Sequence, residues 1–169
     1  MPFEANNVVL FQGDSITDCG RSRDHQQANH PQGLGFGYAR YVAAMLLEHF
    51  ASLNLQIHNR GISGNKVTDL ADRWDVDCLE IKPDVLSILI GVNDTWHSTG
   101  KGNPIAVTME TYDTTYRQLL DDAKSANANV QFVLCMPFVL RCGAVGDHWF
   151  PEITDRQNIV RQIASDYNA

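Results

Sequence analysis

Short apolar runs alternate with longer amphipathic stretches along this chain, and the alternation restricts the possible folds more than any other feature. Runs with the length and composition of buried strands occupy residues 8–11, 55–59, 84–90 and 130–136. Apolar residues recur at helical spacing in residues 38–50, 67–74, 109–126 and 153–167. Strands that alternate with helices predict a parallel sheet with right-handed crossovers and helices on both faces, a three-layer α/β/α sandwich.

The chain has 169 residues, which is the size of one domain. No linker, internal repeat or low-complexity segment divides it, so we expect a single domain over residues 1–169. Apolar residues make up 44% of the chain and charged residues 20%, which is typical of a globular protein. A domain of this size buries enough surface to fold without a disulfide or a structural metal.

The charge balance argues against two classes of partner. Asp and Glu outnumber Lys and Arg by 20 to 13, a formal net charge of −7, whereas nucleic acids and anionic membranes attract basic patches. No run approaches the ~20 apolar residues of a membrane span, and residues 1–7 do not resemble a signal peptide. The four cysteines form no Cys-x-x-Cys pair, which favours reduced thiols and a cytoplasmic protein.

Polar and glycine-containing segments follow each of the first three predicted strands. They are Gly13-Asp14-Ser15-Ile16, residues 59–65 with the sequence Asn-Arg-Gly-Ile-Ser-Gly-Asn, and Gly91-Val92-Asn93-Asp94. Ligands of open parallel sheets bind at the carboxyl ends of the strands. We therefore expect the three segments to form one site.

Each segment carries a group that suits ester hydrolysis. Ser15, on a tight strand-to-helix turn, is a candidate nucleophile. The N–H of Gly61 and the side-chain amide of Asn93 are candidate donors to an oxyanion. Taken singly, Ser15 could be part of a helix cap, Gly61 part of a turn and Asn93 part of an Asx turn. Their occurrence after successive strands favours the catalytic interpretation.

Together the segments resemble the sequence blocks of the SGNH hydrolases, the GDSL family of esterases and lipases. Residues 13–21 and 83–96 are similar to the small bacterial branch of that family. The resemblance implies a flavodoxin-like fold, no metal or cofactor, and Ser15 as the nucleophile. The N–H groups of Ser15 and Gly61, with the Asn93 side chain, would then form the oxyanion hole, where loss of one donor typically costs on the order of 10²–10³ in rate.

One block of that family has no counterpart in this chain. The family places an aspartate three residues before a histidine near the C-terminus, and this pair activates the serine. Asp94 and His97 have the same spacing, but we expect them on one loop with Asn93; His25 and His30 are further candidates for the base. We therefore expect a C-terminally incomplete domain that lacks a last strand and helix, about 30 residues or more.

These features predict a serine ester hydrolase that cleaves small esters through an acyl-enzyme on Ser15, weakly active or inactive in this form. The resemblance suggests an acetyl group on a carbohydrate, with Trp96 as a candidate sugar-stacking wall. The alternative is a non-catalytic ligand-binding module on the same fold.

Because an incomplete sheet would expose an edge, we also expect a homo-oligomer that covers it. Residues 33–37 (Gly-Leu-Gly-Phe-Gly) do not follow a strand, which argues against nucleotide binding.

Overall fold

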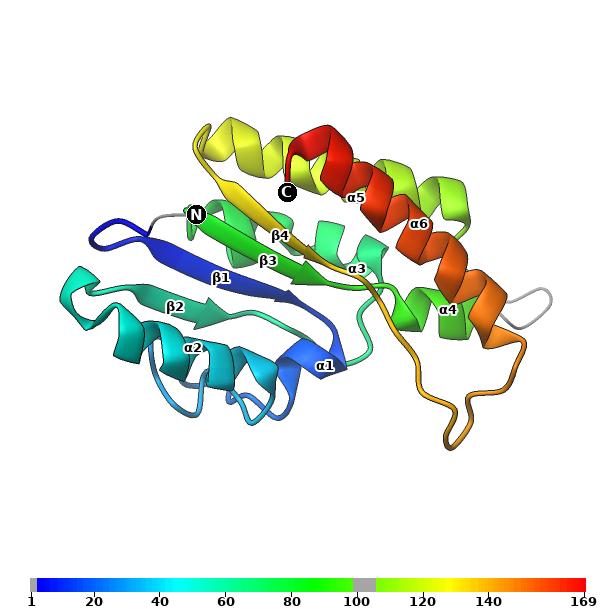
Figure 1. Ribbon diagram of the computed structural model, residues 1–169, viewed down its shortest axis with the longest axis horizontal. Helices are drawn as coiled ribbons and strands as arrows, with labels where there is room; N and C mark the ends of the chain where they lie inside the picture. Colours follow the sequence, from blue (N-terminus) through cyan, green and yellow to red (C-terminus); the bar gives the residue numbers. More distant parts are fainter. Residues whose placement is uncertain (1–2, 99–105) are drawn as a thin grey trace.

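The computed structural model describes residues 3–98 and 106–169. Within this part of the chain, a sheet of four parallel strands runs through the molecule in the order β2-β1-β3-β4 (Figure 1). The strands are β1 (Val8–Gly13), β2 (Gln56–Asn59), β3 (Val85–Leu89) and β4 (Gln131–Cys135). All four lie where the apolar runs predict them, so the predicted α/β class and parallel sheet are confirmed.

Helices connect the strands. The long ones are α2 (Tyr38–His49), α5 (Met109–Ala126) and α6 (Trp149–Tyr167), the short ones α1 (Ser15–Asp18), α3 (Val67–Ala71) and α4 (Val92–Ser98), and single turns form η1 (Ala51–Leu53) and η2 (Asp75–Leu79). Helix α6 begins earlier than the predicted residue 153 because Pro151 falls in its first turn, where a helix needs no N–H from that residue. No helix in the described ranges combines the length and apolar character of a bilayer span.

The sheet contributes to a hydrophobic core on each of its faces. Successive strand residues point to opposite faces, so Val9 and Phe11 of β1 belong to one core and Leu10 to the other. Leu10 packs in the larger core with α3, α5 and α6, whereas Val9 and Phe11 pack with α2. Figure 1 shows α2 on one side of the sheet and α5 and α6 on the other.

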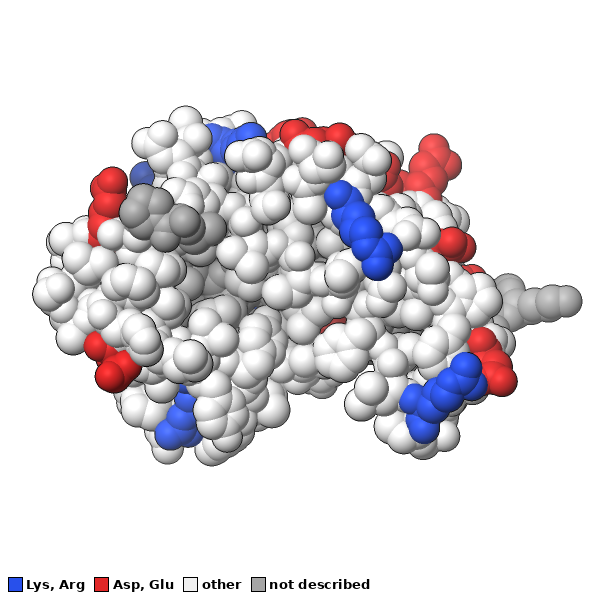
Figure 2. Space-filling view, viewed as in Figure 1, with Lys and Arg blue, Asp and Glu red and all other residues white. Residues whose placement is uncertain are grey.

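The face of the sheet that carries α2 is covered over β1, β2 and β3 but less completely over β4, as far as the described residues go. Val133 of β4 remains 41% exposed on this face. An apolar groove of about 280 Å³ runs between α2 and the strands. It is lined by Phe3, Val9, Phe11, Tyr38, Val42, Leu46, Val85, Ser87, Val133 and Cys135. Figure 2 shows this side of the molecule with a wide central area that carries few charged side chains.

Candidate active site

Ser15 is the first residue of α1, directly beyond the end of β1, and it is exposed. Gly13 allows the tight turn: its φ is +155°, and a Cβ there would lie 2.3 Å from the Leu89 carbonyl oxygen. Asp14 caps α1, because its Oδ1 accepts the Ile16 N–H at 2.9 Å. Neither the hydroxyl nor the N–H of Ser15 has a hydrogen-bond partner among the described residues. Both groups are therefore open to a ligand.

The loop after β2 packs against α1 through Gly61. A Cβ on Gly61 would lie 2.4 Å from the Asp18 nitrogen, so this contact requires a glycine. The Gly61 N–H donates to Asn59 Oδ1 at 2.9 Å, and the Gly61 carbonyl accepts from Arg21 Nε at 2.6 Å. The N–H that the sequence assigns to the oxyanion hole is thus engaged inside the fold, and Gly61 joins this loop to α1.

Gly64, three residues farther along the same loop, offers an open N–H. Its φ is +87°, and no atom lies within 4 Å of the position that a Cβ would take. The residues beside it are held in place, since Ser63 N–H donates to Asp18 Oδ2 at 2.9 Å and Asn65 N–H to the Ile62 carbonyl at 3.2 Å. The Gly64 N–H itself has no acceptor in the part of the chain that the structure describes.

Asn93 lies in the first turn of α4, so its segment is a helix and not the predicted loop. Asn93 is largely buried, and its Nδ2 donates one hydrogen to the Asn65 carbonyl at 3.0 Å. This bond holds the Asn93 amide beside the residue that follows Gly64, and leaves the second amide hydrogen for a ligand. Donors on Ser15, Gly64 and Asn93 thus follow β1, β2 and β3, and groups in this arrangement can stabilise an oxyanion.

Two buried carboxyl groups lie next to these residues. Asp14 is 1% exposed and Asp94 fully buried, and one oxygen of each has no hydrogen-bond partner among the described residues. The other oxygen of Asp94 accepts the Val67 N–H at 3.0 Å at the start of α3. Burial raises the pKa of both groups to about 6, and the charge of Asp94 adds to the rise at Asp14.

No histidine among the described residues is joined to Ser15 by a hydrogen bond. His97 lies on α4, one turn beyond Asn93, and the Asp94 carboxylate binds the Val67 N–H instead of His97. His25 and His30 stack on each other in the loop after α1, with ring centroids 4.2 Å apart. The candidates for a general base that the sequence offers do not form a triad in this structure.

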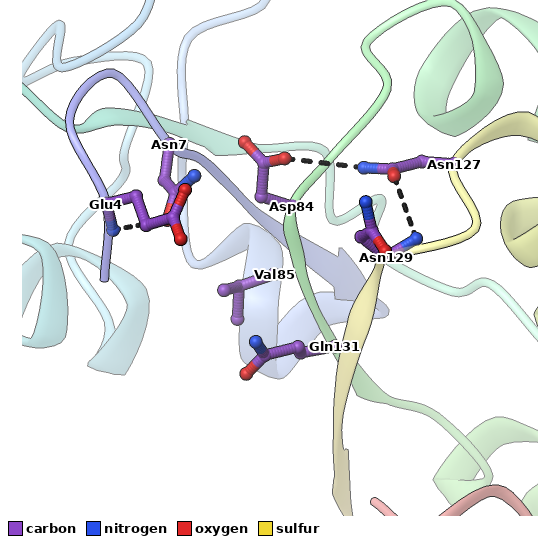
Figure 3. A pocket seen from close by; sticks show the side chains of 7 residues that line it. All are labelled: Glu4, Asn7, Asp84, Val85, Asn127, Asn129 and Gln131. Carbon is purple, nitrogen blue, oxygen red and sulfur yellow. Dashed lines mark hydrogen bonds between the residues drawn. The ribbon is translucent and has the colours of Figure 1, made fainter. Parts of the chain in front are cut away.

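A second hollow, of about 380 Å³, lies at the opposite ends of the strands (Figure 3). The side chains of Asn7, Asp84 and Asn127 in this hollow bind one another or the backbone. Asp84 accepts from the Val8 N–H at 2.8 Å and from Asn127 Nδ2 at 3.3 Å, and the Asn7 side chain accepts the Glu4 N–H at 2.7 Å. These bonds tie the starts of β1 and β3 to neighbouring turns, which is a structural role.

Comparisons with known proteins identify relatives of this chain. Residues 11–169 match the profile of the GDSL-like lipase/acylhydrolase family. The chain is 34% identical, over 171 aligned positions, to an acetylxylan esterase of Geobacillus stearothermophilus, and the match covers all of this chain and 76% of the esterase. The crystal structure of that esterase superposes with a TM-score of 0.85 at 34% identity, again over 100% of this chain and 76% of the esterase.

A structure from Parabacteroides merdae, assigned to the GDSL-like lipases, is more similar. It has a TM-score of 0.93 and 46% identity, and the match covers 99% of this chain and 77% of that one. Solved variants of the Geobacillus esterase include catalytic mutants in which a serine, an aspartate or a histidine is replaced by alanine. The profile match and the two relatives show that this chain belongs to the GDSL-like lipase/acylhydrolase family and is a carboxylic ester hydrolase.

Proposed function

We propose that Ser15 is the nucleophile of this esterase. The backbone N–H groups of Ser15 and Gly64, together with the side-chain amide of Asn93, form its oxyanion hole. The observation that carries the proposal is the occurrence of one exposed hydroxyl and three N–H donors with a free hydrogen just beyond the carboxyl ends of the neighbouring strands β1, β2 and β3. Gly64 takes the role that the sequence assigned to Gly61, because the Gly61 N–H is bonded to Asn59.

In this mechanism Ser15 Oγ attacks the carbonyl carbon of the ester, and the carbonyl oxygen becomes an oxyanion that accepts the three N–H groups. Collapse of the tetrahedral intermediate expels the alcohol and leaves an acyl group on Ser15. Water then attacks the acyl carbon, the same donors stabilise the second oxyanion, and the acid leaves. Preorganised donors that cannot rotate away, such as those of Gly64 and Asn93, contribute most to such catalysis.

An acetyl ester of a carbohydrate is the substrate class that we propose. The similarity to an acetylxylan esterase supports it. Trp96, on the same helix as Asn93, is 55% exposed, and its ring packs edge-on against Trp149 with centroids 5.5 Å apart. A tryptophan ring held in this way on the helix that carries Asn93 offers an apolar surface to the face of a sugar ring.

We also propose that the proton of Ser15 passes to an aspartate–histidine pair on a further segment of the protein. The catalytic aspartate and histidine mutants of the Geobacillus esterase support this, as does the share of that esterase, 76%, that the chain covers. The product of the complete gene should then hydrolyse esters faster than residues 1–169. A gene product that ends at Ala169 and needs no partner chain for full activity would contradict it.

Hydrolysis of p-nitrophenyl acetate by the product of the complete gene and by its Ser15→Ala variant tests the proposed nucleophile. We expect the Ser15→Ala variant to lose the serine-dependent acceleration, because it lacks the hydroxyl that carries the acyl intermediate. Ser125→Ala, an exposed serine of α5, is the matched control and should keep the rate of the unmodified chain. Equal rates for all three proteins would contradict the esterase mechanism and favour the non-catalytic ligand-binding module.

A further inference from the structure

Arg73, between α3 and η2, holds three separate parts of the molecule with one guanidinium group. Its Nε donates to Asn65 Oδ1 at 2.8 Å, and its Nη1 donates to Asp77 Oδ2 at 2.9 Å. Its Nη2 donates to the Gly13 carbonyl at 3.4 Å. The side chain is only 15% exposed, so water competes weakly for these bonds.

Two of the three contacts belong to the segments that carry the proposed catalytic groups. Asn65 follows Gly64 directly, and its carbonyl accepts the Asn93 side chain at 3.0 Å. Gly13 is the glycine of the turn that presents Ser15. The Arg73 guanidinium therefore spans from the loop with one oxyanion donor to the turn with the nucleophile, and reaches Asn93 through Asn65.

We propose that Arg73 is a positioning residue that fixes the oxyanion donors relative to Ser15. This inference rests on the esterase mechanism proposed above. Arg73 touches neither Ser15 nor the expected position of the substrate, and it acts through Asn65 and Gly13. Without it, the loop that contains Gly64 would keep its bonds to α1 and the bond from the Ile62 N–H to the Gly13 carbonyl, but Asn65 would lose its link to the end of β1.

The shape of arginine accounts for the residue type at this position. A planar guanidinium can donate in several directions at once, whereas the ammonium group of a lysine is a single point with a different reach. Asp77 holds the group in place and compensates its charge. Asp77 is itself anchored, because its carbonyl accepts Gln12 Nε2 at 2.7 Å and its carboxylate lies 3.6 Å from Arg60 Nε.

Steady-state kinetics of Arg73→Lys and Arg73→Gln, made in the product of the complete gene, test the proposal. We expect kcat for p-nitrophenyl acetate to fall about 10²-fold with KM nearly unchanged, the loss that follows when catalytic groups shift by about 1 Å. The matched control is Arg117→Gln, which removes an arginine bound to Asp113 and Asp166 on α5 and α6 and should keep the kcat of the unmodified chain. Guanidinium added at millimolar concentration should restore part of the kcat of Arg73→Ala.

Hydrogen exchange followed by mass spectrometry gives a readout that does not depend on turnover. In Arg73→Gln, amides of residues 61–66 should exchange faster, while those of α5 keep their rates. Unchanged exchange in residues 61–66, or a kcat like that of the unmodified chain, would overturn the positioning role. The esterase mechanism has a separate test: if Ser15→Ala keeps full activity, that mechanism fails, whatever the Arg73 variants show.

Discussion

Asp14 and Asp94 make the stability of this protein depend on pH. Burial raises the pKa of each carboxyl group from 3.8 to about 6, so between these values the folded state binds more protons than the unfolded state. The free energy of unfolding therefore falls as pH rises from about 4 to about 6. The contribution of each group is fully present below pH 4 and lost above pH 6.

Asp94→Asn should remove one of these two contributions. The asparagine can still accept the Val67 N–H, but it does not ionise. Urea unfolding at pH 4 and at pH 7 should show a smaller loss of stability for the variant than for the unmodified chain, by up to about 3 kcal/mol. The exposed Asp155→Asn on α6 serves as control. An identical pH dependence in Asp94→Asn and the unmodified chain would show that Asp94 does not titrate in this window.

The sequence predicted Ser15 and Asn93 as functional residues because each stands in a distinctive segment directly after a strand. It assigned the donor of the loop after β2 to Gly61, whereas we propose Gly64 of the same loop. The difference depends on the Asn59 side chain, which turns back onto the Gly61 N–H. Arg73 carries no signal in the sequence, because its partners are 60, 8 and 4 residues away along the chain and meet only in the fold.

Helix α6 is attached to the site by a buried arginine. Arg156 is fully buried, and its Nη2 donates to the Val107 carbonyl at 2.9 Å and to the Asp94 carbonyl at 3.3 Å. Its Nη1 donates to Glu152 Oε2 at 2.8 Å. Through these bonds α6 supports α4, which carries Asn93.

Arg156→Met should destabilise the protein by about 2–4 kcal/mol, because it leaves buried carbonyl oxygens without their donors. Urea unfolding measures the effect. Arg161→Met removes an exposed arginine from the same helix and should change stability by less than about 0.5 kcal/mol. If Arg156→Met is as stable as the unmodified chain, the buried guanidinium does not hold α6 in place.

Strand and helix periodicity predicted the long elements closely, but it missed α4. That helix is short and polar, and it begins at Val92, shortly after β3 ends at Leu89. A short helix gains its stability from tertiary contacts and not from its own sequence. Here Thr95 Oγ1 donates to the Gly91 carbonyl at 2.9 Å, and Tyr112 Oη donates to the Ile90 carbonyl at 2.8 Å.

The apolar groove beside α2 and the edge of β4 expose surface that proteins usually cover, and we propose that copies of this chain associate through it. Sedimentation velocity should show association that grows with concentration. Val133→Lys places a charge on the exposed part of β4 and should shift the protein toward monomer. Gln118→Lys on α5 is the control. A monomeric unmodified chain at all concentrations would contradict this.

Acylation of Ser15 can be observed directly. The chain is mixed with p-nitrophenyl acetate, the reaction is stopped with acid, and the modified peptide is located by mass spectrometry. We predict an acetyl group on the Ser15 hydroxyl, and much less of it when Asn93→Ala removes one oxyanion donor. Serine-dependent hydrolysis without acetyl-Ser15, or equal acetylation in Asn93→Ala, would contradict the proposed site.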